Sequence, residues 1–110
     1  MKKVKVFAGI CGFTTHIEAI DKGDYNATLV LDSECPNWQK VNTILEGRQL
    51  NVMTELFKDK TTGELNSVVL NTALSVIPHV SCPVISGALK ALEVNVGLAL
   101  PQDAYIKIVP

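Results

Sequence analysis

The sequence has 110 residues, of which 47% are apolar and 19% are charged, and its formal net charge is −1. This composition indicates a chain that buries a hydrophobic core, and the length predicts a single domain over residues 1–110. The order of the elements predicted below makes that domain α+β. The near-neutral charge and the aromatic content of only 5% argue against nucleic-acid binding. No apolar stretch reaches the roughly 18–20 residues that a membrane helix needs, so we expect no membrane partner.

The first half of the sequence predicts a β-hairpin followed by a helix. Apolar and polar side chains alternate over residues 2–10 and again over residues 25–32, which is the pattern of β-strands. We expect these two strands to pair in an antiparallel hairpin around a loop at residues 11–23. A helix then begins at Pro36, because proline is favoured at the first helical position, and Gly47 is a typical stop.

The second half predicts two further helices and a final strand. Residues 49–64 fit neither period and stay unassigned, apart from a turn at their end. Residues 65–77 fit a largely buried helix, and Pro83 begins another that Gly97 closes. Residues 105–109 read as a last strand. The order predicts a small, mainly antiparallel sheet, made of the N-terminal hairpin and the C-terminal strand, packed against about three helices.

Three cysteines carry the strongest chemical signal in the chain. Their odd number favours reduced thiols in the cytoplasm over a disulfide scaffold. Cys35 and Cys82 each precede a proline, so each is a predicted helix N-cap, where unpaired amides and the helix dipole stabilise a thiolate. Cys11 precedes Gly12, which places it in a tight turn that a ligand can approach closely.

If the three cysteines converge, they form a site for a thiophilic metal. Three thiolates suit zinc or an iron–sulfur cluster, with Cys11, Cys35 and Cys82 as the ligands. His79, three residues before Cys82, is the candidate for a fourth ligand, and His16 is a weaker one. The paired Cys-x-x-Cys knuckles of zinc ribbons are absent from the sequence, so the spacing does not select zinc.

Two other functions compete with metal binding. The first is thiol chemistry without a metal, either redox sensing or sulfur transfer, with Cys35 or Cys82 as the nucleophile. The second is a non-catalytic, homo-oligomeric interaction module in which the cysteines only pack, suggested by the very apolar stretch at residues 68–100. No nucleotide-binding loop, serine nucleophile elbow or metalloprotease motif identifies a reaction, so the sequence leaves open whether the protein is an enzyme.

The motifs Cys11-Gly12-Phe13, Ser33-Glu34-Cys35-Pro36 and His79-Val80-Ser81-Cys82-Pro83 together resemble a family of small prokaryotic proteins of unknown function. That resemblance covers most of the chain and implies one domain without implying an activity. A second resemblance is local: the helix after Cys82-Pro83, which contains Lys90, is similar to the Cys-Pro-x-Pro helix of TusA/SirA-type sulfur carriers. In those carriers the cysteine holds a persulfide, but Ile85 stands here in place of their second proline.

Overall fold

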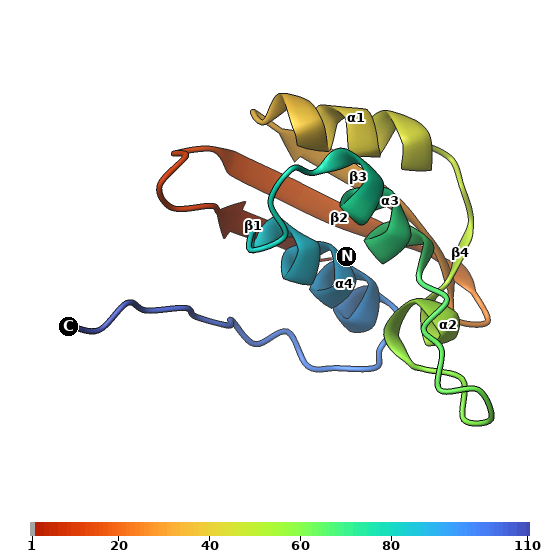
Figure 1. Cartoon of the computed structure of the whole chain (residues 1–110). Helices are drawn as coiled ribbons and strands as arrows, with labels where there is room; N and C mark the ends of the chain where they lie inside the picture. Colours follow the sequence, from red (N-terminus) through yellow and green to blue (C-terminus); the bar gives the residue numbers. More distant parts are fainter. Residues whose placement is uncertain (1) are drawn as a thin grey trace.

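A computed structural model describes residues 2–110 and shows an α+β fold (Figure 1). Within these residues lie four strands and four helices, one helix more than the approximate number expected. In chain order the elements are β1 (Lys3–Phe7), β2 (Thr14–Gly23), β3 (Asn26–Ser33), α1 (Pro36–Leu45), β4 (Leu50–Asn51), α2 (Val52–Leu56), α3 (Val68–Val76) and α4 (Val84–Asn95). None of the described helices is long and apolar enough to cross a membrane.

The sheet has the strand order β1-β2-β3-β4, and every neighbouring pair is antiparallel. The predicted hairpin between residues 2–10 and 25–32 is therefore wrong, because β2 lies between those two strands and pairs with both. The charged end of β2 at Asp21 and Lys22 reads as a loop in sequence. In the structure it leads into a tight turn in which Asp24 and Tyr25 both have positive φ, of 52° and 60°. Positive φ at both central residues is the geometry that joins two antiparallel strands most tightly.

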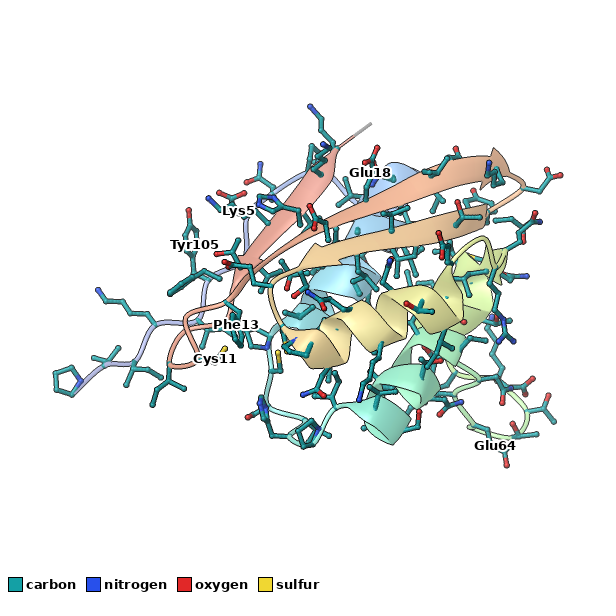
Figure 2. The ribbon with its side chains drawn as sticks, turned by 90° about the horizontal axis from the view of Figure 1, so that it is seen from above. Lys5, Cys11, Phe13, Glu18, Glu64 and Tyr105 are labelled. Carbon is teal, nitrogen blue, oxygen red and sulfur yellow. The ribbon has the colours of Figure 1, made fainter. Side chains whose placement is uncertain are left out.

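Helices cover one face of the sheet and leave the other face open. Helix α1 packs on β3, and α4 packs on β1 and β2 (Figures 1 and 2). Side chains alternate accordingly along β2, where Ile17 and Ala19 are fully buried and His16 is exposed. Such an alternation is the mark of an antiparallel sheet with one face on the core and one in water.

Helix α4 approaches β1 unusually closely. A Cβ atom at Gly87 would collide with a methyl group of Val6 and would lie 3.2 Å from Cδ1 of Ile17. The absence of a side chain at Gly87 therefore sets the spacing between the helix and the sheet. At the far end of α4, the side-chain amide of Asn95 donates to the carbonyl of Lys2 and accepts from its N–H, both at 2.9 Å.

The helices expected at Pro36 and Pro83, and the one within residues 65–77, are present as α1, α4 and α3. The unassigned residues 49–57 hold the short elements β4 and α2. The expected strand at residues 105–109 is wrong: that segment pairs with no strand of the described chain and is exposed throughout. Alternation alone does not make a strand, because a strand also needs a neighbour for its backbone hydrogen bonds.

Candidate functional site

Four of the five candidate ligands predicted from the sequence border one pocket. The pocket has a volume of about 160 Å³ and lies where three segments meet: the loop after β1, the start of α1, and the loop that joins α3 to the start of α4. Its lining comprises Ala8, Cys11, Phe13, Thr15, Cys35, Pro36, Asn37, Trp38, Ile77, His79, Cys82 and Val84. His16 is not among them, because it lies on the exposed face of β2 opposite Lys5 and Asp32.

Cys11 stands at the rim of this pocket, in the tight loop between β1 and β2 (Figure 2). The N–H of Gly12 donates to the carbonyl of Gly9 at 2.9 Å, and the N–H of Ala8 donates to the carbonyl of Phe13 at 3.0 Å. Gly9 and Gly12 have φ of 90° and 74°, which glycine adopts without strain. The loop therefore holds the exposed Cys11 on a defined backbone.

Cys35 is the N-cap residue of α1, as the sequence predicts. Its N–H donates to Oγ of Ser33 at 3.0 Å, and its carbonyl accepts from the N–H of Gln39 at 3.0 Å. Ser33 is in turn fixed by a 2.7 Å hydrogen bond between its hydroxyl and that of Thr15, which also lines the pocket. The backbone of Cys35 is thus held on both sides, while its half-buried side chain makes no capping hydrogen bond.

Cys82 forms the deeper part of the pocket, with only 8% of its surface exposed. Pro83 already has helical backbone angles, and the carbonyl of Cys82 accepts from the N–H of Ile85 at 3.4 Å. The N-cap residue of α4 is Pro83, so the expectation that Cys82 is the N-cap is wrong by one position: Cys82 lies directly before the cap. His79 is exposed and approaches the pocket from the loop that precedes it.

The helix starts at the pocket differ from the other helix starts of the described chain. Oδ1 of Asn51 accepts from two amides of α2, and Oγ of Ser67 accepts from the N–H of Leu70 in α3. Helices α1 and α4, which both begin at the pocket, have no side-chain cap and no acidic residue in their first turns. Cys35, at the N-cap of α1, and Cys82, directly before the N-cap of α4, therefore lie at helix ends that carry partial positive charge and no side-chain cap.

The cysteines and histidine share the pocket without forming a preformed ion site. Within residues 2–110, no group of three or more histidine, cysteine or acidic side chains is arranged to hold a metal ion. Tetrahedral zinc keeps each thiolate about 2.3 Å from the metal, which requires the sulfur atoms to lie within about 4 Å of one another. Metal ligation by Cys11, Cys35, Cys82 and His79 stays a prediction, whereas their gathering around one pocket is a property of the fold.

Sequence reasoning missed the apolar part of the site. Besides the cysteines, the pocket is lined by the apolar residues Phe13, Trp38 and Ile77. Trp38 is also a core residue, with only 1% of its surface exposed. The helical spacing of Trp38 indicates a core residue and does not reveal that it also borders a pocket. The two glycines that flank the Cys11 loop, Gly9 and Gly12, are the signal that could have marked this loop as a shaped element.

The chain belongs to a family of unknown function, DUF6951, whose model matches residues 2–108. The match agrees with the expected membership of an uncharacterised family and covers nearly the whole chain. No curated protein and no solved structure matches the chain significantly.

Proposed function

We propose that this member of a family of unknown function binds a thiophilic group, in first place an iron–sulfur cluster, through Cys11, Cys35 and Cys82. His79 serves as the fourth ligand. The observation that carries the proposal is that these four residues, from three separate segments, line one pocket. Thiolates are the standard ligands of iron–sulfur clusters, and histidine replaces cysteine in some of them.

The size of the pocket favours a group larger than a single ion. One water molecule needs roughly 10–15 Å³ of such space, so about 160 Å³ admits an occupant of several atoms. A cluster spreads its ligand sulfurs over several irons, and its ligands therefore stand farther apart than those of one zinc ion. This agrees with thiols that share a cavity without forming a ready-made ion site within the described residues.

The local electrostatics support the same proposal. A cluster with thiolate ligands carries negative charge, and helix N-termini with free amides stabilise negative charge. Helices α1 and α4 both present such ends at the pocket. The apolar walls, which include Phe13 and Trp38, restrict the access of water to the occupant, and solvent access is one of the factors that tune such centres.

The direct test is anaerobic purification and reconstitution with iron and sulfide, followed by metal and sulfide analysis and a visible spectrum. We expect iron and sulfide in fixed ratio to protein, with iron–sulfide absorbance that is lost in Cys11→Ala, Cys35→Ala and Cys82→Ala. Ser75→Ala is the matched control, because Ser75 is an exposed residue of α3 outside the pocket. Protein that takes up neither iron nor zinc, or cysteine variants that load as fully as the control, would refute the proposal.

A second candidate is sulfur transfer by Cys35 without a metal. Cys35 is half-buried, has no capping duty and opens onto the pocket, whereas Cys82, the position that resembles the TusA/SirA-type cysteine, is buried. In this reaction the Cys35 thiolate attacks the outer sulfur of a donor persulfide, the S–S bond breaks, and the donor leaves as a thiolate. Cys35 then holds the persulfide, stabilised by the start of α1.

Mass spectrometry separates the two candidates. Metal-free protein is incubated with a small-molecule persulfide, and each cysteine peptide is examined for a mass gain of one sulfur atom. Sulfur transfer predicts the gain on Cys35 ahead of the more exposed Cys11. Modification in order of exposure, with Cys11 first, would exclude a specific role for Cys35 in this reaction.

A further inference from the structure

The two edges of the sheet are finished in different ways. On the outer side of β3, β4 pairs only with residues 26–27, and side chains of α1 continue the cover. Oδ1 of Asn42 accepts from the N–H of Leu31 at 2.8 Å, and Nε2 of Gln39 donates to the carbonyl of Ser33 at 2.9 Å. This edge is therefore closed to further strands, as the edges of natural sheets generally are.

The outer edge of β1 is open. The side-chain amide of Asn95 forms hydrogen bonds with the N–H and the carbonyl of Lys2, directly before the strand. From there to Phe7, no described residue outside β2 makes a hydrogen bond with the backbone of β1. An edge of this kind offers a row of unpaired N–H and C=O groups to any extended segment.

The C-terminal segment is extended and has no partner within the described chain. Residues 101–110 are exposed, and Figure 1 shows the C-terminal segment passing below α4 and extending beyond the sheet at its end. Large apolar side chains in this segment stand almost fully in water: Tyr105 (85% exposed), Ile106 (81%), Ile108 (89%) and Val109 (72%). The family match extends through residue 108, so the segment is part of the region that defines the family.

We propose that residues 105–109 of one copy pair as a fifth strand with the open edge of β1 in a second copy. The alternation fits this place. Ile106 and Ile108 would extend the face on which Val4 and Val6 pack against the core, and Tyr105 and Lys107 would lie on the open face of the sheet. The backbone ladder supplies the hydrogen bonds that both segments lack, and the isoleucines supply the buried apolar area.

The position of the segment favours a second copy over its own chain. Helix α4 ends beside the start of β1, because Asn95 is hydrogen-bonded to Lys2. Residue 105 follows Gly97 by eight residues, which span about 26 Å in extended chain, whereas the five residues of β1 span only about 17 Å. A chain that ran straight along its own β1 would therefore carry residues 105–109 past the end of that strand.

The charges of β1 favour the C-terminal segment over a second β1 strand. Lys3 and Lys5 point to the same face, so two β1 edges in antiparallel pairing would set lysines against lysines. Like charges directly opposite each other destabilise a strand pair. The C-terminal segment carries only one lysine, Lys107. Asp103, two residues before Tyr105, could form an ion pair with a lysine of β1.

The test uses the full chain, by sedimentation velocity over a concentration series and by hydrogen exchange. We expect a dimer in which the amides of residues 106–108 are protected and lose protection on dilution. Replacing both isoleucines, Ile106→Lys with Ile108→Lys, should raise the dissociation constant of the dimer about a hundredfold, since two buried side chains are lost. The control pair Met53→Lys with Leu74→Lys makes the same change at exposed residues of α2 and α3 and should leave the dimer intact.

Three results would overturn the proposal. The first is a monomer at every concentration with an unprotected C-terminal segment. The second is a monomer in which the segment is protected at every dilution, which would mean that it docks on its own chain. The third is a dimer whose dissociation constant is the same in the Ile106→Lys with Ile108→Lys variant as in the control variant. Unchanged circular dichroism of the lysine variants excludes misfolding, which is not expected because the replaced side chains lie in water in the isolated chain.

Discussion

Helices α2 and α3 begin on side chains that accept hydrogen bonds from their first amides, whereas α1 and α4 begin at the cysteine-lined pocket without such side chains. A side-chain cap typically stabilises a protein by about 1 kcal/mol, so the pocket forgoes stability that the rest of the fold uses. Cys35 occupies a capping position with suitable backbone angles, yet its sulfur is a poor acceptor. In the proposed function, the ligand of the pocket takes the place of these missing caps.

At the start of α3, by contrast, side chains accept hydrogen bonds from the first backbone amides of the helix. The buried carboxylate of Glu55, in α2, accepts from the Ser67 hydroxyl at 3.0 Å and from the amides of Val68 and Val69, both at 2.8 Å. The Ser67 hydroxyl accepts in turn from the N–H of Leu70 at 3.1 Å. These hydrogen bonds join α2 to α3, and no buried side-chain nitrogen or oxygen of the described residues lacks a partner.

The largest expected effect is at Glu55. Glu55→Gln replaces a carboxylate oxygen by an amide group that faces a donor, so we expect a loss of about 3 kcal/mol in the free energy of unfolding. Urea denaturation measures it, with Glu64→Gln, in an exposed turn, as a control that should stay within about 0.5 kcal/mol (Figure 2). Loading of the pocket should be unchanged. Equal stability of the two variants would show that the buried network is unimportant.

A smaller loss is expected from the cap itself. Ser67→Ala removes the acceptor for Leu70 and the donor to Glu55, so we expect the protein to lose about 2 kcal/mol of stability. Ser75→Ala, in the exposed part of the same helix, serves as the control for thermal denaturation. If the two changes lower the melting temperature alike, the contrast between capped and uncapped helix starts loses its energetic basis.

The opposite sign is expected at the pocket. Cys35→Ser places a good acceptor at the N-cap of α1, so the ligand-free protein should gain about 1 kcal/mol of stability. The same change should abolish loading with iron and sulfide, because it removes a proposed ligand. Parallel measurement of denaturation and metal content tests both parts. A destabilised variant would mean that the Cys35 side chain contributes packing that outweighs the new cap.

The smallest effect concerns a capped turn far from the pocket. Hydrogen bonds from the backbone amides of Thr62 and Thr61 lower the pKa of Asp59 below its ordinary value of 3.8. A lowered pKa in the folded state adds stability above the unfolded value, and this is lost as the pH falls through the folded pKa, here below about pH 4. Asp59→Asn keeps an acceptor without a charge and should flatten that part of the profile. A carboxyl titration by NMR at or above 3.8 would contradict the assignment.

Much of the helical part could be predicted from local sequence. Pro36 and Pro83 mark the starts of α1 and α4 because the fixed φ of proline and its missing N–H suit a first helical turn. The absence of strand–helix–strand alternation indicates the α+β class, since that alternation is what builds a parallel sheet. Cys35 and Cys82 could be singled out as candidates because Cys-Pro is a local sequence feature, whereas the apolar lining from Phe13, Trp38 and Ile77 could not.

Only the tertiary structure decided which strands pair and which cysteines border the same pocket. Residues 14–23 form the second strand of the sheet because β1 and β3 flank them, and residues 105–109, which alternate more regularly, are unpaired in the described chain. The sequence could not show that Cys11, Cys35 and Cys82 border the same pocket, since they are separated by 24 and 47 positions. Strand pairing and pocket formation depend on contacts between distant segments, and local periodicity carries no record of them.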